Sequence, residues 1–156
     1  MEERVSKPPE LTGYSTHRLV AGLAGQAQYV DNGDHLLIRR EPTKSDAELG
    51  SIVGFTLKAC VSVKVRGRHR YFPISDWRSR HEWLGRQGER NGFEVLTVHA
   101  EAGMQRIKTH DGRDFTVDAT RFVGALKVTD LEKFNQALAK GIGNNAKAFG
   151  FGMLSL

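Results

Sequence analysis

The sequence predicts an α+β protein made of two ferredoxin-like (βαββαβ) units in tandem, of which the first is shortened. From Ile52 onward, segments with strand and helix patterns follow one another in the order βαββαβ, with one extra hairpin, and this order is typical of a ferredoxin-like unit. The residues before Ile52 can form a shortened copy of such a unit that lacks a convincing first strand. We therefore expect a shortened N-terminal unit over residues 1–50 and a C-terminal unit over residues 51–156.

The first fifty residues predict one helix and one hairpin. We expect residues 1–12 to be a loose leader, because two consecutive prolines in this segment disfavour both helix and strand. Thr12 can cap a short helix that has apolar residues at helical spacing and ends near Gly25. Asn32-Gly33 then predicts a tight turn, because this pair readily adopts positive φ. Strands are expected on either side of the turn, over 27–30 and 35–40.

The second half predicts two capped helices among strands. Ser75-Asp76 and Thr129-Asp130 each open a helix, and a glycine ends each of them. Trp77 and Trp83 lie on the first of these helices with its apolar residues, so we expect both in the core. Strand patterns are expected over 52–65, 93–99, 105–108, 115–117, 121–128 and 151–156.

Length and composition narrow the class of protein. The chain has 156 residues, of which 39% are hydrophobic and 26% charged, as in an ordinary globular protein. Its apolar runs are too short for a membrane span, and its start does not have the apolar run of a secretory signal. A single cysteine, Cys60, excludes an internal disulfide and a cysteine-based zinc site. We therefore expect a cytoplasmic protein.

The positive charge is concentrated in one segment. Residues 53–90 carry nine Lys or Arg against three Asp or Glu, whereas residues 1–52 carry six against eight and residues 91–156 carry eight against seven. A local basic surface attracts polyanions, and nucleic acid is the commonest of them. The alternative interpretation is a solvated face that only keeps the protein soluble.

Tyr14 and His17 form the first candidate site. Helix positions three apart share a face, so the two side chains are expected to project together. Histidine can give or take a proton at neutral pH, and a nearby tyrosine can orient a hydroxyl or donate a hydrogen bond to a phosphate oxygen. The alternative is a partly exposed histidine and a packed tyrosine at a helix start.

A run of cations forms the second candidate. Four basic residues are spaced by two, so an extended ribbon is expected to align them on one face, where they can follow a phosphate backbone. They are Lys64, Arg66, Arg68 and Arg70. Arginines of the following helix are expected to add charge nearby, at Arg78, Arg80, Arg86 and Arg90. The alternative is an edge strand protected by charge against aggregation.

A glycine-rich tail forms the third candidate. Gly141, Gly143, Gly150 and Gly152 free the backbone to bring N–H groups close to an anion, and Lys147 adds a point charge. The segment is not a P-loop, and it follows a helix, whereas the dinucleotide fingerprint precedes one. The alternative is a plain loop, which would need only the first of these glycines.

Three segments together resemble one family. They are YSTHR at 14–18, RFVGALKVTD at 121–130 and GIGNNAKAFGFGMLSL at 141–156. In order and spacing they are similar to segments of the repeat-processing endoribonuclease of the type I-E Cascade system of CRISPR immunity, the CasE (Cse3) family of the RAMP superfamily. The resemblance extends from about residue 14 to residue 156.

The resemblance implies a function and roles for residues. Members of this family cut CRISPR precursor RNA within the repeat, at the base of its stem-loop, without a metal or another cofactor. They leave a 2′,3′-cyclic phosphate, keep the product and join the Cascade subunits. The resemblance implies that His17 is the general acid or base, that Tyr14 is its partner and that Lys147 is a contact in the tail. On charge grounds, Arg18, Lys64, Arg66, Arg68 and Arg70 are further candidates for RNA contacts, and the glycines of the tail, Gly141, Gly143, Gly150 and Gly152, are candidates beside Lys147.

The chain also departs from the family at its start. The family begins with a full β-strand, whereas here only a short segment with two prolines precedes the helix of His17, so we expect that strand to be missing. An alternative function is therefore a noncatalytic subunit that binds the crRNA hairpin with the same fold. A third hypothesis is a protein–protein module whose basic face is incidental.

Overall fold

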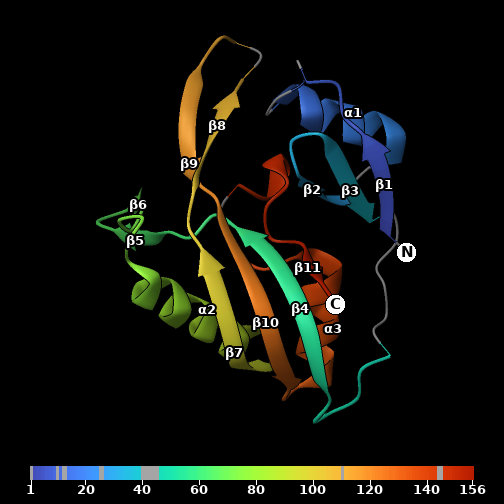
Figure 1. Cartoon of the computed structure of the whole chain (residues 1–156), viewed down its shortest axis with the longest axis vertical. Coiled ribbons are helices and arrows are strands. Elements are labelled where there is room, and N and C mark those ends of the chain that lie inside the picture. Colours follow the sequence, from blue (N-terminus) through green and yellow to red (C-terminus); the bar gives the residue numbers. More distant parts are fainter. Residues whose placement is uncertain are drawn as a thin grey trace.

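The computed structural model in Figure 1 describes residues 2–9, 11, 14–24, 27–39, 46–109, 111–143 and 146–156. Its elements in chain order are β1 (Glu2–Ser6), α1 (Tyr14–Ala24), β2 (Gln28–Asp31), β3 (His35–Arg39), β4 (Ile52–Ala59), β5 (Val63–Val65), β6 (Arg68–Arg70), α2 (Trp77–Asn91), β7 (Phe93–Glu101), β8 (Met104–Lys108), β9 (Asp114–Asp118), β10 (Thr120–Val128), α3 (Leu131–Lys140), the 3₁₀ helix η1 (Lys147–Phe149) and β11 (Leu154–Ser155). Among the described residues, no helix is both long enough and apolar enough to cross a membrane.

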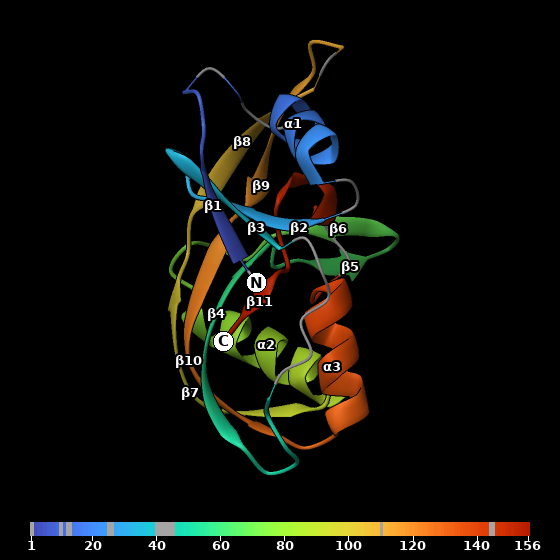
Figure 2. The same ribbon diagram turned by 90° about the vertical axis from the view of Figure 1, so that its right-hand side faces the viewer.

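The C-terminal part forms the predicted ferredoxin-like unit. Its four strands are antiparallel and lie in the order β11-β4-β10-β7, with α2 and α3 packed on the same face of the sheet (Figure 2). The strands β8 and β9 form the extra hairpin between β7 and β10. Phe122 on β10 and Phe134 on α3 are fully buried in the core between the sheet and its helices. Each such side chain stabilises the fold by about 1.5–3 kcal/mol.

Local capping explains where the two helices of this unit begin and end. The Asp76 carboxylate accepts a hydrogen bond from the Ser79 N–H at 2.9 Å, and Asp130 accepts one from the Lys133 N–H at 3.1 Å. Gly92 ends α2 with a φ of 76°, and a Cβ at this position would lie 2.2 Å from the Asp130 carbonyl oxygen. Glycine is therefore required where the end of α2 meets the start of α3.

The described residues before β4 form three strands and one helix, and the first of these strands is the one that was expected to be missing. Their sheet is antiparallel in the order β1-β3-β2, the arrangement of the first three strands of a ferredoxin-like unit. The expectation of a loose leader without a first strand was wrong. Residues 2–6 pair with β3 over their full length, from Glu2 opposite Arg39 to Ser6 opposite His35. Pro8 and Pro9 follow this strand, so they end it and do not prevent it.

Two further local predictions were wrong. Trp83 is buried as expected, but Trp77 is 57% exposed because it occupies the first position of α2, beyond the edge of the core. Its ring lies edge-on to His81, with the centroids 5.3 Å apart. The strand expected over 151–156 contracts to Leu154–Ser155, because Gly150 and Gly152 adopt positive φ just before it.

The two sheets meet at the last turn of α3. The guanidinium of Arg39 on β3 donates to the Leu138 carbonyl at 2.9 Å and to the Leu154 carbonyl at 2.7 Å. The amide nitrogen of Gln28 on β2 donates to the Leu138 carbonyl at 2.9 Å and also to the Ala139 carbonyl. The last carbonyls of a helix have no partners within the helix. Side chains of the N-terminal sheet therefore cap a helix of the C-terminal unit.

Lys58 on β4 adds a buried charge to the same boundary between the sheets. Its amine donates to the Asp31 carbonyl at 2.6 Å and lies 5.2 Å from the centroid of the Phe151 ring. Burial, with the charge of nearby Arg121 adding to it, lowers the pKa of the Lys58 amine to about 8. A lysine in this position favours the neutral form more strongly in the folded chain than in the unfolded one.

We predict that Lys58→Met changes the pH dependence of stability. Between about pH 8 and the ordinary lysine pKa, the unfolded wild-type chain binds more protons than the folded one, so the free energy of unfolding contributed by Lys58 rises with pH. The free energy of unfolding is measured by denaturant titration at pH 7 and at pH 10. From the lower to the higher pH, the value for wild type should rise by about 2–3 kcal/mol relative to the value for Lys58→Met. A difference between the two proteins that stays the same at both pH values would contradict this account.

Candidate functional site

His17 and Lys147 line one cavity, although 130 positions of the chain separate them. The cavity has a volume of about 670 Å³ and lies where α1 and β2 face the end of α3 and η1. Figure 2 shows α1 above this region, with the glycine-rich tail beneath it. Gln28, Tyr29, Lys140 and Gly141 also belong to the polar part of the lining. The structure therefore brings the first and third predicted sites together.

Packing of α1 orients His17 toward the cavity. Thr16 and Val20 are buried on the side of α1 that faces the N-terminal sheet, and Val20 packs in the core of that sheet. His17 is half-buried at the edge of this packed surface, and Arg18 is exposed beside it. Tyr14 begins the helix, but its side chain lies outside what the structure describes.

The glycines of the tail shape the path of the chain. A Cβ at Gly150 would lie 2.8 Å from the Tyr29 ring, and one at Gly152 would lie 2.5 Å from the Ile142 carbonyl oxygen. The N–H groups of Gly141, Gly150 and Gly152 already donate to carbonyls within the chain, which corrects the expectation that they are held open for an anion. These glycines therefore position the tail, and Gly141 and Gly143 also line cavities.

Lys147 is held beside the end of α3. Its amine lies 3.3 Å from the Lys140 carbonyl oxygen and 3.4 Å from that of Gly141. The Tyr29 hydroxyl donates to the Ala148 carbonyl at 2.7 Å and so fixes the turn that carries Lys147. Partial burial, with the nearby Lys140 charge, lowers the pKa of the Lys147 amine below its ordinary value. A cation in this position can face an anionic ligand in the cavity.

Two more cavities continue from this one toward the β5–β6 hairpin. The second, of about 250 Å³, shares Lys140, Gly141 and Lys147 with the first. The third, of about 650 Å³, shares Gln87 and Arg90 with the second and reaches the hairpin. We call the three together the basic track. The cations and the imidazole that line its second and third parts are Lys133, Lys140, Lys147, Arg86, Arg90, Lys64 and His69.

The basic track has one sign of charge. The described residues that line its three cavities include no Asp or Glu. In the same described ranges, His, Cys, Asp and Glu side chains do not gather in groups of three that could hold a metal ion. Low-dielectric walls around a single sign of charge focus the electrostatic potential. The track is therefore suited to a polyanion that runs from the hairpin to His17.

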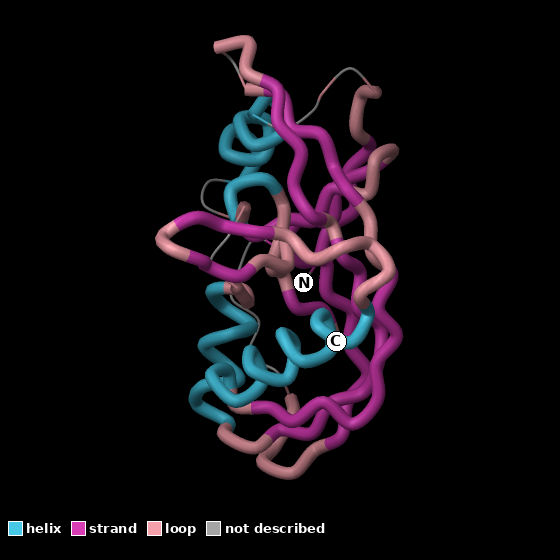
Figure 3. The backbone as a smooth tube through the Cα atoms, turned by 90° about the vertical axis from the view of Figure 1, so that its left-hand side faces the viewer, coloured by secondary structure: helices cyan, strands magenta, loops and turns pink. Residues whose placement is uncertain are grey.

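The hairpin, which we call the arm (residues 63–70), does not present its cations as predicted. Lys64 pairs with His69 and Val65 pairs with Arg68, while Arg66 and Gly67 form the turn with positive φ. Paired residues share a face of a ribbon, so Lys64 and His69 face one side and the arginines of β6 face the other. The predicted alignment of four cations was wrong because the turn reverses the chain. Figure 3 shows the arm projecting from the body of the molecule.

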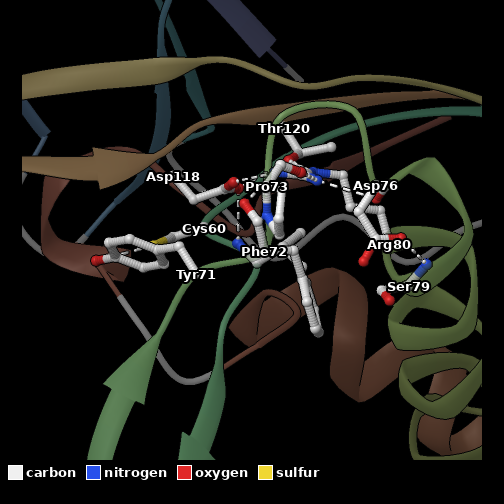
Figure 4. A network of polar contacts seen from close by, with 10 residues as sticks. Cys60, Tyr71, Phe72, Pro73, Asp76, Ser79, Arg80, Asp118 and Thr120 are labelled. Carbon is white, nitrogen blue, oxygen red and sulfur yellow. Dashed lines mark hydrogen bonds and ion pairs between the residues drawn. The ribbon is translucent and has the colours of Figure 1, made fainter.

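A fully buried ion pair lies at the base of the arm (Figure 4). The Arg80 guanidinium donates to the Asp118 carboxylate at 2.7 Å and to the Thr120 hydroxyl at 3.0 Å, and no part of the Arg80 or Asp118 side chain is exposed. The expectation that Arg80 adds surface charge was therefore wrong. Arg80 lies one turn before Leu84 on the buried face of α2, and this spacing in the sequence is the signal that distinguishes it from the exposed arginines.

This ion pair fixes both ends of the arm. Asp118 accepts a hydrogen bond from the Val61 N–H at 3.1 Å, just before β5. Arg80 donates to the Phe72 carbonyl at 3.3 Å and to the Pro73 carbonyl at 2.6 Å, just after β6. The two strands of the arm therefore leave and rejoin the body at one buried polar cluster, which holds the arm against the third cavity.

Gln87 and Lys140 also line the track, although nothing in their local sequence singles them out. Gln87 lies one turn after Trp83 and one residue after Arg86, on the side of α2 that faces the cavities. Lys140 is the last residue of α3, where a cation interacts favourably with the helix dipole, so it looked like an ordinary helix end. Only the approach of the glycine-rich tail brings it beside Lys147.

Family membership follows from the comparison with known proteins. The family model of CRISPR associated proteins matches residues 2–156. The chain belongs to this family. The predicted resemblance is thereby confirmed across almost the whole chain. A search among curated proteins finds no match.

Solved structures have the same fold. Thermus thermophilus Cse3, bound to an RNA representing a pre-cleavage complex, matches with a TM-score of 0.75 and 20% identity over 99% of this chain and 96% of that one. Cas6e from Escherichia coli K-12 matches with a TM-score of 0.77 and 17% identity over 99% and 97%. A chain of a CRISPR RNA-guided surveillance complex matches with a TM-score of 0.72 and 19% identity, over 99% of this chain and 97% of that one. At these identities the likeness establishes the fold.

We predict that Arg80→Met destabilises the protein by about 3–5 kcal/mol, because it leaves the Asp118 carboxylate buried without its partner. Urea denaturation measures this loss, and hydrogen exchange should show faster exchange of the arm amides. The matched control is Arg106→Met, which removes an exposed arginine paired with Asp114 on the β8–β9 hairpin and should change stability little. Equal stability of Arg80→Met and wild type would refute the role of the pair.

Proposed function

We propose that this protein is a metal-independent endoribonuclease that binds the stem-loop of CRISPR precursor RNA and cleaves the repeat at the base of the stem. The observation that carries the proposal is the shared cavity of His17 and Lys147 at one end of a track whose described lining contains no acidic residue, with the arm at its other end. This arrangement supports an RNA backbone that runs along the track and presents one phosphate between the imidazole and the amine.

The proposed reaction needs acid–base catalysis and charge stabilisation. The ribose 2′-oxygen attacks the adjacent phosphorus and loses its proton, the bond to the 5′-oxygen breaks, and that oxygen takes up a proton. The products are a 2′,3′-cyclic phosphate and a 5′-hydroxyl. His17 transfers a proton in this reaction, which contributes about 10²–10⁴-fold. Lys147 stabilises the charge that develops on the phosphorane. We assign Tyr14 as the partner that orients the reacting groups beside His17.

Contacts to phosphates would dominate the binding of the stem. The major groove of A-form RNA is too narrow for side chains to read, so proteins recognise RNA stems by shape and by backbone contacts. The arm and α2 enclose the third cavity, and their cations fit this mode. Arg66, Arg68 and Arg70 on the arm and Arg18 on α1 are proposed as further phosphate contacts. Cse3 of the same fold has been solved with RNA bound, which supports the assignment.

The proposal includes a division of the chain and a partner. Residues 1–50 would form the shortened unit that carries His17, and residues 51–156 the unit that carries the arm and the tail. A chain of the same fold belongs to a CRISPR RNA-guided surveillance complex. We therefore propose that this protein keeps its product and acts as a cytoplasmic subunit of such a Cascade complex.

The test is cleavage of repeat RNA in the presence of EDTA. Wild type should give a product that ends in a 2′,3′-cyclic phosphate. His17→Ala should slow single-turnover cleavage by about 10²–10⁴-fold, with the affinity for the hairpin within a few-fold of wild type. The matched control is His99→Ala, which removes an exposed histidine of β7 outside the track and should cleave normally.

Three outcomes would count against the proposal. RNA that wild type binds tightly but leaves intact would support the alternative of a noncatalytic hairpin-binding subunit. Cleavage by His17→Ala at the wild-type rate would remove the imidazole from the mechanism. An absence of RNA binding at low salt would contradict the proposal altogether, because contacts between cations and phosphates are strongest under that condition.

A further inference from the structure

Gln87 is an almost buried amide whose side chain has no hydrogen-bond partner in the part of the chain that the structure describes. The residue is 9% exposed. Among the described residues, the one hydrogen bond of Gln87 outside the helix ladder uses its backbone carbonyl, which accepts from the Asn91 amide at 2.7 Å. The donor and acceptor atoms of the side-chain amide are therefore available to a group that enters the track.

The Gln87 amide is open to the basic track. Gln87 lines both the second and the third cavity and so lies at their junction. A group that lies at this junction therefore comes next to the Gln87 side chain.

The position of Gln87 is fixed by its surroundings. Trp83, one turn earlier on α2, stacks on Phe122 with ring centroids 6.1 Å apart and interplanar angle 6°. On the other side, a Cβ at Gly143 would lie 3.4 Å from the Trp83 ring, so the glycine-rich tail passes close to this part of α2. Gln87 follows this packed indole by one turn on the same helix, and a side chain on a rigid helix is suited to discriminating contacts.

The chemistry of Gln87 differs from that of its neighbours in the track. Lys64, Arg86 and Arg90 are cations, and contacts of cations to phosphates position a nucleic acid without reading its sequence. An amide presents one acceptor and two donor hydrogens in one plane, and glutamine forms a bidentate pair with N6 and N7 of adenine. A phosphate, by contrast, would use only the donor half of the amide and would leave its oxygen without a donor.

The third cavity has room for one nucleotide. Its volume of about 650 Å³ falls within the range of small-molecule sites. Its walls combine the cations of α2 and the arm with a hydrogen-bonded pair, since the Ser62 hydroxyl and the His69 ring nitrogen are 3.2 Å apart. Sequence-specific recognition of RNA acts mainly on unpaired bases, whose edges are free for hydrogen bonds. The cavity therefore has room for one unstacked nucleotide beside the stem.

We infer that Gln87 is a specificity-determining residue that reads the base of one unpaired nucleotide beside the stem, with adenine the base whose edge fits the amide. The inference rests on the proposed function, because it assumes that RNA lies in the track. In this arrangement Arg86 and Arg90 bind the phosphates of that nucleotide, and Gln87 supplies the hydrogen bonds that depend on base identity.

The test measures affinity against a set of repeat hairpins in which each unpaired nucleotide beside the stem is changed in turn to each other base. Wild type should lose about five- to one-hundredfold in affinity when one adenine is changed, the range of a bidentate base contact. Gln87→Ala should bind the original hairpin more weakly and should discriminate less than twofold at that position. Gln87→Leu, which keeps the side-chain volume, should behave in the same way and guards against a packing defect.

The matched control is Gln105→Ala, which removes a half-buried amide of β8 outside the track and should discriminate as wild type does. The inference is overturned if both Gln87 variants weaken all hairpins equally, since that marks a phosphate contact. It is also overturned if they match wild type throughout, since the amide is then only structural. A failure of the proposed function is distinguishable, because wild type itself would then not bind the hairpins.

Discussion

The site depends on hydrogen bonds that cross from the N-terminal sheet to the end of α3. Arg39 and Gln28 donate to the Leu138 carbonyl, which helix geometry leaves without a partner inside the helix, and Arg39 continues to the Leu154 carbonyl of the final strand. Hydrogen bonds from a charged donor contribute about 1.5–3 kcal/mol each, and leaving the carbonyls unpaired would cost a similar amount. The sheet that carries α1 is thereby held in one orientation, and His17 comes to face Lys147.

A second constraint acts at the other end of the track. The Arg80–Asp118 pair holds both ends of the arm, so the position of the arm does not depend on the N-terminal sheet. The hydrogen bonds to the end of α3 keep the His17 imidazole beside the tail, and the Arg80–Asp118 pair keeps the arm over α2. Between them the track is lined by cations and amides, so electrostatics alone can guide a polyanion along it, while the Gln87 amide is the group proposed to distinguish one base from another.

Local signals in the sequence predicted most of the fold. Asp76 and Asp130 cap the helices as expected, because capping involves residues three apart and needs no distant partner. Signals that depend on a partner elsewhere in the chain were misjudged. The first strand exists because β3 pairs with it, although its own sequence is polar and borders prolines. Arg80 is buried because Asp118 lies across from it, and a charge pattern along one helix does not reveal such a partner. For the candidate site, the family resemblance implied that His17 and Lys147 act together, whereas local patterns alone do not predict their shared cavity, which depends on how the two sheets meet.

The measurement that tests this account most directly compares Arg39→Met with wild type in two assays on the same repeat RNA. Removing the guanidinium breaks the link between β3 and the end of α3 but leaves the arm and α2 in place. The account predicts that single-turnover cleavage falls by at least about tenfold while hairpin affinity stays within a few-fold, because misplacement of about 1 Å can cost about a hundredfold in rate. Arg113→Met, which alters an exposed arginine beside the β8–β9 turn, controls for the loss of a positive charge, and circular dichroism checks the fold of both variants. Cleavage by Arg39→Met at the wild-type rate would contradict the claim that these hydrogen bonds hold the two sides of the site together.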